Sequence, residues 1–226
     1  MSRYKKPERY RQILTMPNVT QLQHYQQGDH AGIRGNWHRI FGNGNPLTLE
    51  LACGKGEYSL ALASRCPDQN FIGIDIKGDR IWKGATRALS EKLHNVHFLR
   101  ARIDHICNYF ADQEVSGIWI PFPDPYLRKS KKRKRLTHPV FLERYSRVMV
   151  PGGLVHLKTD SDLLYDFTME TLERYDIPIR HHIPDLSACE SIPDYLDIRT
   201  YYEEQHRAAG RTIRYVCFQI HGIFNA

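Results

Sequence analysis

The sequence predicts an α/β protein with a doubly wound, mostly parallel sheet of seven strands and helices on both faces. Three observations lead to this prediction. Short apolar runs alternate with segments of about 10–15 residues whose apolar positions recur at helical spacing. A glycine-containing turn lies directly between the first apolar run and the first helical segment. Four acidic residues, Glu50, Asp75, Asp124 and Asp160, fall at or just past the ends of such runs and should lie along one edge of the sheet, where parallel sheets bind ligands.

Each strand is predicted from a short run of β-branched, aromatic and other apolar residues bounded by turn residues. The seven strands are expected at residues 47–51, 71–76, 96–99, 117–121, 154–159, 178–183 and 213–222. Helices are expected at 57–64, 78–93 and 103–110, after the start signal at 137–139, and after the cap at 160–162. Strands that alternate with helices in this way indicate βαβ units and parallel pairing.

The length of 226 residues fits one large domain with extensions. We expect a basic, flexible N-terminal arm over residues 1–45, because charged, Gln-rich and Gly-rich stretches precede the first apolar run. Regular structure is expected to begin at Leu47. A single domain should then cover residues 46–226, with a polar insertion near 184–210. The net charge of +7 favours an anionic partner, with nucleic acid ahead of acidic lipid.

Several classes of protein are disfavoured by the composition. The five cysteines are odd in number and form no C-x-x-C pair, which indicates inert thiols in a reducing compartment. The histidines match no common spacing of metal ligands, so no metal is expected. The N-terminus has no secretory signal, and no run of about 18 apolar residues occurs. We therefore expect a cytoplasmic protein without a membrane span, acting as a monomer or homodimer with no obligatory partner subunit.

The turn after the first strand has the features of a ligand-binding loop. It reads Glu-Leu-Ala-Cys-Gly-Lys-Gly-Glu over residues 50–57, and Gly54 and Gly56 allow a tight turn and close approach of a ligand. Ser59 stands where a dinucleotide fingerprint has its third glycine, and the Gly-Lys-Ser/Thr of a phosphate-binding loop is missing. The acidic residues around the loop suit a cofactor with cationic groups, such as S-adenosylmethionine. Asp75, at the end of the second strand, is placed to bind two ribose hydroxyls.

A carboxylate followed by a block of cations comes after the fourth strand. Asp124 lies between two prolines, and residues 128–135 contain seven lysines or arginines. Such a block supplies affinity for a phosphate backbone independently of base sequence. A solvated face or a nuclear localisation signal has the same composition. Arg128 is the cation nearest to Asp124 and is expected to serve both the acidic turn and the basic block.

Five motifs occur in one order along the chain, at residues 50–57, 71–75, 121–125, 158–160 and 200–203. With these motifs, the chain resembles the tRNA (guanine-N7-)-methyltransferase family in its compact bacterial form. The resemblance runs from about Leu47 to Gly222. It implies a class I methyltransferase of Rossmann-like fold that transfers a methyl group from S-adenosylmethionine to N7 of a guanosine in the variable loop of tRNA.

The resemblance also implies roles for individual residues. The cofactor-binding residues would be Glu50, Gly54, Gly56, Asp75, Arg102, Ile103 and Asp124. The residues that bind the substrate would be Arg128, Asp160, Thr200 and Glu203. Asp124 matches the catalytic acid. Since guanine N7 has a lone pair at neutral pH, we expect Asp124 to position the base and stabilise its growing positive charge rather than remove a proton.

Two departures from the family pattern leave other functions open. Arg102 stands where the family usually has an aspartate near the adenine, and Tyr126 replaces a usual tryptophan. One alternative is a methyltransferase that acts on rRNA or on a small molecule. The basic block makes a small-molecule substrate less favoured. A second is a non-catalytic RNA-binding module, which Arg102 favours and the acids Asp75 and Asp124 oppose. A third is an NAD-dependent oxidoreductase, which Ser59 opposes.

Overall fold

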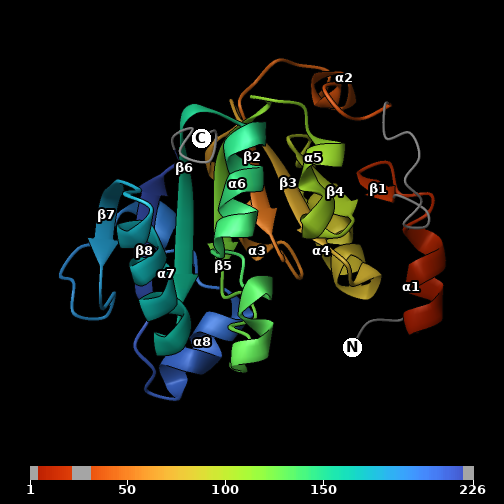
Figure 1. The fold of residues 1–226 in the computed structure, drawn as a ribbon. Helices are drawn as coiled ribbons and strands as arrows, with labels where there is room; N and C mark the ends of the chain where they lie inside the picture. Colours follow the sequence, from red (N-terminus) through yellow and green to blue (C-terminus); the bar gives the residue numbers. More distant parts are fainter. Residues whose placement is uncertain (1–4, 22–31, 221–226) are drawn as a thin grey trace. The chain divides into compact units, whose positions relative to one another are not determined.

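The computed structural model describes residues 5–21 and 32–220 of the chain (Figure 1). Their contacts divide the protein into two compact units, residues 1–111 and residues 112–226. Each unit contains four strands and several helices among its described residues. The candidate cofactor loop belongs to the first unit, and the acidic turn with its basic block belongs to the second.

Among its described residues, the first unit contains four parallel strands: β1 (Val19–Gln21), β2 (Leu47–Leu51), β3 (Asn70–Asp75) and β4 (Val96–Arg100). They lie in the order β1-β4-β3-β2, with every neighbouring pair parallel. All residues of β2 and β3 are buried, and residues 71–74 of β3 accordingly form a continuous apolar run, whereas β2 also buries the polar residues Thr48 and Glu50. The order β4-β3-β2 is that of one nucleotide-binding half of a doubly wound sheet.

The helices of the first unit pack their apolar stripes on these strands. They are α1 (Lys6–Gln12), α2 (Trp37–Phe41), α3 (Glu57–Arg65), α4 (Gly78–Ser90), the 3-10 turn η1 (Ile103–His105) and α5 (Ile106–Tyr109). In α4, Ile81, Ala85 and Ala88 recur at helical spacing and are completely buried. Both α3 and α4 contact β3 and β4. The helices expected at 57–64, 78–93 and 103–110 are therefore present, with small shifts at their ends.

Regular structure begins at Lys6, so the expectation that it begins at Leu47 is wrong. Helix α1 packs on α4, where Trp82 Nε1 donates a hydrogen bond to Gln12 Oε1 at 2.6 Å. The side chains of Ile13 and Trp37 are both only 1% exposed. These anchors are too widely spaced in a polar background to produce a periodic signal. Part of the Gln-rich stretch, residues 22–31, lies outside the described residues, and the division into an arm and a domain from residue 46 stays a prediction.

Among its described residues, the second unit contains four strands that pair in both parallel and antiparallel fashion: β5 (Val115–Pro121), β6 (Met149–Thr159), β7 (Ile179–Ile183) and β8 (Arg214–Gln219). They lie in the order β5-β6-β8-β7. Strands β5 and β6 are parallel, whereas β8 is antiparallel to both β6 and β7. Pro121 pairs with Lys158, so β5 and β6 end at the same edge. The residues that follow both strands therefore lie at that edge.

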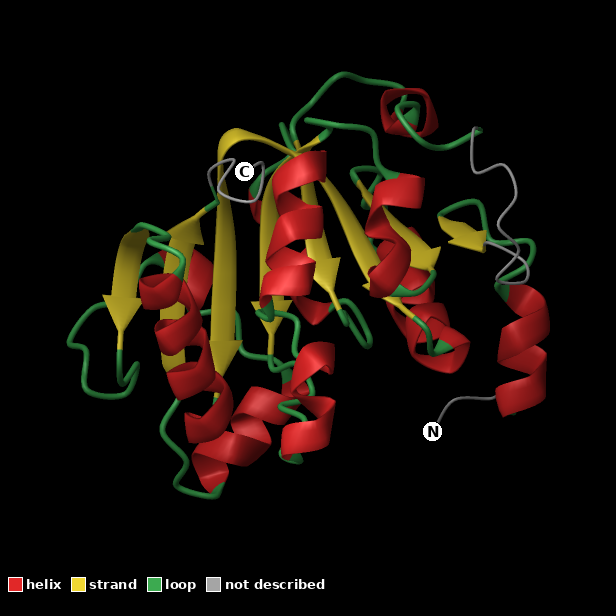
Figure 2. Ribbon diagram, in the orientation of Figure 1, coloured by secondary structure: helices red, strands yellow, loops and turns green. Residues whose placement is uncertain are grey.

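Helices cover and extend the strands of the second unit. They are η2 (Lys129–Lys134), α6 (Pro139–Val148), α7 (Asp162–Arg174), η3 (Asp194–Leu196) and α8 (Tyr201–Ala208). Helices α6 and α7 contact β6 and lie in front of the strands in Figure 2. His138 Nδ1 caps α6 by accepting a hydrogen bond from Val140 N, and Ser161 Oγ caps α7 in the same way, as the start signals predict. Helix α8 lies beyond the carboxyl end of β6 (Figure 1).

The predicted α/β fold class is confirmed, with eight strands among the described residues against seven expected. The additional strand is β1, which belongs to the N-terminal segment. None of the five cysteines, all of which lie within the described residues, forms a disulfide. Over residues 5–21 and 32–220, no helix has the length and apolar character needed to cross a membrane. The same residues contain no group of three or more His, Cys, Asp and Glu side chains arranged to hold a metal ion.

Candidate active site

The glycine loop of the first unit has a backbone that few other residues could adopt. Ala52, Gly54 and Gly56 have positive φ angles of 56°, 57° and 67°. A Cβ atom added at Gly56 would lie 2.4 Å from Phe98 Cε1, so packing as well as φ requires glycine there. At Gly54 the nearest atom to an added Cβ would be Arg80 Nη1 at 4.0 Å. The loop is thus packed beneath Gly56 and open beside Gly54, where a ligand can approach its backbone.

Asp75 is bonded to this loop. It is the last residue of β3 and only 8% exposed. Its Oδ2 accepts a hydrogen bond from Gly54 N at 2.9 Å, and its Oδ1 accepts one from Lys77 N at 2.8 Å. A carboxylate oxygen can accept two hydrogen bonds, so both oxygens retain capacity for ligand hydroxyls. The structure therefore joins the acid to the loop, and its role in ribose binding stays a prediction.

Glu50 lies on β2 and points into the first turn of α3. Its Oε2 accepts hydrogen bonds from Ser59 N at 2.7 Å and from Ser59 Oγ at 2.6 Å. Burial raises the pKa of Glu50 to about 7, against the opposing effect of these two hydrogen bonds. Ser59, which distinguishes the loop from a dinucleotide fingerprint, thus anchors the buried acid. This arrangement places a second carboxylate close to the loop.

The residues after β4 differ from an acidic adenine site. Arg102 is exposed, and its Nη2 lies 2.6 Å from Asp104 Oδ2 in a surface ion pair. Ile103 begins η1 and is half-buried. Sequence reasoning missed Ile76, an apolar side chain that follows Asp75 directly and is 54% exposed. The sequence feature that could have identified Ile76 is its position, one residue after the acid at the end of the strand.

The first unit fits a cofactor that carries hydroxyl and ammonium groups. Glu50 and Asp75 are both acceptors of hydrogen bonds, and neither is more than 8% exposed. The open side of the loop at Gly54 offers the backbone approach that such a ligand needs. An exposed apolar side chain at Ile76 adds a surface for a flat base. These features match S-adenosylmethionine in the chemistry of their donors and acceptors.

The acidic turn of the second unit follows β5 directly. Phe122 and Tyr126 have positive φ angles of 49° and 45°, which is costly for residues with side chains. Asp124 is exposed, and its Oδ1 accepts a hydrogen bond from Tyr126 N at 3.0 Å. Phe122 N donates to Lys158 O at 2.7 Å, so the turn starts from the edge of β6. An exposed acid on a turn with two strained neighbouring residues is a typical arrangement for a functional site.

The basic block divides into exposed cations and one buried cation. Residues 128–134 are exposed, with Arg128 at the start of η2. Arg135 is only 6% exposed, so its prediction as part of the phosphate-binding block is wrong. Its guanidinium donates to Pro125 O at 3.1 Å and to Tyr126 O at 3.2 Å, and it lies over the ring of Phe167. Arg135 therefore links two carbonyls of the turn after Asp124 to Phe167 of α7.

Asp160 follows β6 and is held by α8 and the residues after it. Its Oδ2 lies 2.6 Å from Arg211 Nη1 and 3.3 Å from His206 Nδ1. The ring of His206 also stacks on Phe122, with 5.8 Å between the ring centroids. One histidine of α8 therefore contacts both Asp160 and the turn that carries Asp124. Sequence reasoning missed His206 and Arg211, because these contacts connect distant parts of the chain.

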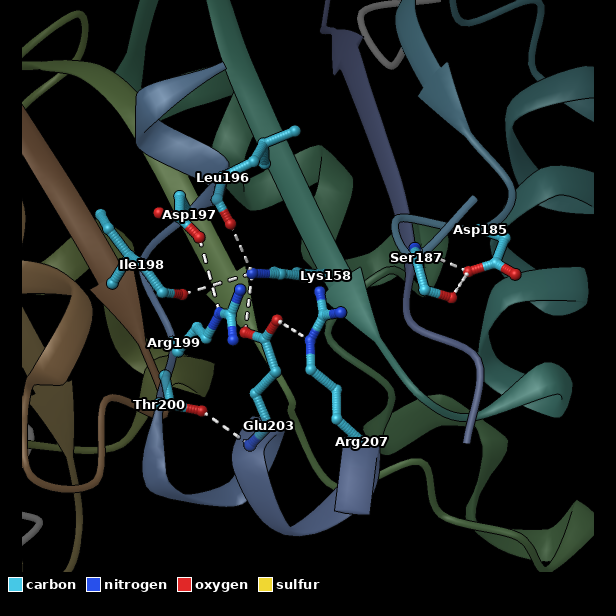
Figure 3. Close-up of polar contacts among 10 residues, drawn as sticks. All are labelled: Lys158, Asp185, Ser187, Leu196, Asp197, Ile198, Arg199, Thr200, Glu203 and Arg207. Atoms are coloured by element: carbon cyan, nitrogen blue, oxygen red, sulfur yellow. Dashed lines mark hydrogen bonds and ion pairs between the residues drawn. The ribbon is translucent and has the colours of Figure 1, made fainter. Parts of the chain in front are cut away.

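Thr200 and Glu203 are buried and serve α8 itself. Thr200 Oγ1 accepts a hydrogen bond from Glu203 N at 3.1 Å and caps the helix. Glu203 is completely buried, with Oε2 2.7 Å from Lys158 Nζ and Oε1 2.9 Å from Arg207 Nε (Figure 3). Desolvation lowers the pKa of Lys158, and the charge of Glu203 opposes this shift. Within the second unit, Thr200 and Glu203 thus form one connected group with Lys158, and Asp160 contacts the same helix through His206, whereas Arg128 lies on the separate basic block.

The expected row of four strand-end acids spans the two units. Within the first unit, Glu50 and Asp75 lie on neighbouring strands, where Glu50 pairs with Gly73. Within the second unit, Asp124 and Asp160 follow two neighbouring strands that end at one edge. The alignment of all four acids along a single edge stays a prediction.

Comparison with known proteins identifies relatives along most of the chain. The sequence model of a family described as "Putative methyltransferase" matches residues 44–216. A tRNA (guanine-N(7)-)-methyltransferase of Bacteroides thetaiotaomicron is 40% identical over 95% of this chain and 85% of its own length. The same-named protein of Porphyromonas gingivalis is 44% identical over 90% of this chain and 85% of its own. That of Geobacillus thermodenitrificans is 33% identical, with coverages of 80% and 82%.

Solved structures share the fold at low sequence identity. The 16S rRNA methyltransferase KamB superposes with a TM-score of 0.64 and 12% identity, covering 88% of this chain and 96% of its own. A structure titled as an antibiotic-related methyltransferase gives a TM-score of 0.61 and 14% identity, with coverages of 88% and 98%. These similarities show the methyltransferase fold. The family model and the curated relatives show that the chain belongs to the tRNA (guanine-N7-)-methyltransferase family.

Proposed function

We propose that this protein transfers a methyl group from S-adenosylmethionine to N7 of a guanosine in the variable loop of tRNA. The observation that carries the proposal is the exposed acid Asp124, followed at once by the exposed basic residues of 128–134. An acid at the end of a strand can hold a base, and the cations beside it can hold the phosphates on either side. The 40% identity to a tRNA (guanine-N(7)-)-methyltransferase supports this substrate.

We assign the binding of the cofactor mainly to residues of the first unit, with Asp124 as the one contact from the second. The bound cofactor supplies an electrophilic methyl group attached to a positively charged sulfur. Asp75 would accept hydrogen bonds from two ribose hydroxyls, using the capacity left by its two backbone donors. Gly54 and Gly56 would let the backbone approach the methionine part, and the carboxylate of Glu50 would attract its ammonium group.

The adenine side of the cofactor is assigned to the residues after β3 and β4. Ile76 presents an exposed apolar surface against which a purine can pack. Because the Arg102 side chain is paired with Asp104, backbone groups at Arg102 and Ile103 would carry the hydrogen bonds to the base. This assignment accounts for an adenine site without the acid that the family usually has there.

Asp124 is assigned the guanine. Its carboxylate can accept hydrogen bonds from the amino group and ring N–H of the base, which fixes the position of N7. N7 carries a free lone pair at neutral pH, so Asp124 has no proton to remove. As positive charge grows on the purine, a carboxylate already oriented by Tyr126 N stabilises it. Asp124 is also proposed to contact the cofactor, as the family resemblance implies.

The remaining substrate contacts are assigned to the second unit. Arg128 and the exposed cations that follow would bind phosphates of the tRNA. Asp160 would act with His206 and Arg211, which already contact it, while Thr200 and Glu203 would act through the placement of α8. We also propose a cytoplasmic location and a monomer or homodimer without an obligatory partner subunit. The absence of disulfides among the five cysteines agrees with a reducing compartment.

Methyl transfer to unmodified tRNA tests this function. The protein is incubated with labelled S-adenosylmethionine, and the methyl is mapped by cleavage at the depurination-prone 7-methylguanosine. Asp124→Ala should lower kcat by roughly 100-fold or more while the cofactor Kd stays within about twofold. Asp68→Ala, which removes an exposed acid from another turn, serves as the control and should keep full activity.

Three outcomes would contradict the proposal. Full activity of Asp124→Ala would remove that residue from the site. Methyl transfer to rRNA in place of tRNA would change the substrate. A protein that binds tRNA but neither binds the cofactor nor transfers a methyl group would be an RNA-binding module.

A further inference from the structure

A completely buried ion pair joins β6 to the inserted segment that precedes β8. Lys158 Nζ lies 2.7 Å from Glu203 Oε2, and both side chains are 0% exposed, in an ion pair without hydrogen-bond geometry. The same ammonium donates to Leu196 O at 2.8 Å and to Ile198 O at 3.3 Å. Figure 3 shows Lys158 reaching from the strand between these carbonyls and the carboxylate. One side chain of β6 therefore contacts both η3 and α8.

The Glu203 side of the pair organises α8. Glu203 Oε1 lies 2.9 Å from Arg207 Nε one turn later, and Glu203 N donates to Thr200 Oγ1 at the helix cap. A second ion pair in this segment, Arg199 with Asp197, has both side chains 58% exposed and an N–O distance of 3.5 Å. Exposed pairs of this kind contribute little to stability. The buried pair is thus the contact that can fix the segment to β6.

Stability alone does not explain a buried pair of this kind. Removing two charges from water is costly, and apolar replacements of similar volume are often as stable as the pair they replace. The charges do make the structure more specific, because an ammonium group surrounded by a carboxylate and two carbonyls has few alternative arrangements. Lys158 therefore selects one placement of residues 194–208 relative to β6.

That placement matters because the backbone of Lys158 also supports the acidic turn. Lys158 O accepts a hydrogen bond from Phe122 N at 2.7 Å, two residues before Asp124. Asp160, two residues after Lys158, contacts His206 of α8, and His206 stacks on Phe122. The side chain of Lys158 holds α8, and its main chain holds the turn.

We propose that Lys158 is a positioning residue that fixes α8 and the Asp124 turn in the arrangement needed for methyl transfer. It acts through Glu203 and the carbonyls of η3, and being fully buried it contacts no tRNA itself. This inference rests on the proposed function, because it assigns Lys158 to the same reaction. It explains why Thr200 and Glu203 can matter for the substrate although both are buried.

The first test is Lys158→Met, which keeps an unbranched side chain only one atom shorter and removes the ammonium group. We expect kcat for tRNA to fall by roughly 100-fold, because small displacements of reacting groups have effects of this size. The Kd for S-adenosylmethionine should stay nearly unchanged, since every residue assigned to the cofactor except Asp124 belongs to the first unit. Amide hydrogen exchange at residues 194–208 should become faster, a readout independent of activity. Arg147→Met, which removes an exposed cation paired with Glu143, should change none of these quantities.

The double variant Lys158→Met/Glu203→Leu keeps the proposal testable if Lys158→Met alone does not fold. Removing both charges avoids an uncompensated buried carboxylate, so this protein should fold even where the single variant does not. It still lacks the hydrogen bonds to Leu196 and Ile198, so fast exchange at 194–208 and low kcat should persist. Wild-type kcat and exchange in the double variant would overturn the proposal.

The two hypotheses fail in different ways. If wild-type protein methylates tRNA and Asp124→Ala does not, while Lys158→Met keeps wild-type kcat and exchange, only the positioning role is refuted. If wild-type protein leaves tRNA unmethylated, the proposed function is refuted, and exchange at residues 194–208 still reports whether Lys158 fixes the segment.

Discussion

Replacing Arg135 should damage the acidic turn and leave the binding of phosphates almost unchanged. Arg135 donates to Pro125 O and Tyr126 O, and its guanidinium lies 4.6 Å from the ring centroid of Phe167. A hydrogen bond from a charged donor contributes about 1.5 kcal/mol at the lower end of its range. Arg135→Met keeps an unbranched apolar side chain but loses both hydrogen bonds and the guanidinium over Phe167. The free energy of unfolding should therefore fall by about 3 kcal/mol.

Urea unfolding and steady-state kinetics measure the two consequences of this change. The urea midpoint of Arg135→Met should fall, and its kcat should fall because the turn that carries Asp124 loses its support on α7. Lys132→Met is the matched control, since Lys132 is exposed in the same block. It should keep the midpoint and kcat, raise the KM for tRNA, and reduce the salt slope of binding by about one. The reasoning is refuted if Arg135→Met keeps its midpoint and behaves as Lys132→Met does.

Three further predictions concern stability and the cofactor loop. Gly56→Ala places a Cβ atom against Phe98 at a backbone φ of 67°, so the urea midpoint and the affinity for the cofactor should both fall. Wild-type values of both quantities would contradict the packing argument. The pKa of Glu50 is raised to about 7, so its contribution to stability is complete below pH 4.5 and is lost as pH rises through about 7. In the wild type this loss should lower the free energy of unfolding by about 3 kcal/mol, measured by urea unfolding without cofactor. Glu50→Gln should remove this dependence on pH. Burial lowers the pKa of His97 and His156 to about 4, so the contribution of these two histidines to stability should be lost as pH falls from 6.5 to 4. Unfolding measured against pH should show that His156→Gln is less sensitive to acid than the wild type, and an equal sensitivity of the variant would exclude His156 as a cause.

The features predictable from sequence are those with a local signal. The glycine loop, the acid at the end of β3 and the start of α6 each depend on residues that are neighbours in the chain. Strands β2 and β3 are buried over their full length, and the leucines of β2 and the apolar run at residues 71–74 of β3 made both strands easy to recognise. The conflict between Ser59 and a dinucleotide fingerprint was also local, and its structural explanation is the pair of hydrogen bonds to Glu50.

The features missed from sequence depend on contacts between distant residues. Arg135 is chemically the same as its exposed neighbours, and only the carbonyls of the preceding turn and the ring of Phe167 make it a buried support. Lys158 was visible only as part of a motif, because its partner Glu203 lies in an insertion with little periodicity. Helix α1 and strand β1 are short and polar, and they form because α4 and β4 offer them a surface.

The reacting atom of the substrate tests the central claim most directly. We would compare methyl transfer to two tRNA transcripts, one with guanosine and one with 7-deazaguanosine, in which a carbon replaces N7. The account predicts full transfer to the first transcript and none to the second, with both competing equally for binding because the phosphate contacts are unchanged. Methyl transfer to the 7-deazaguanosine transcript would show that another atom is modified and would contradict the account.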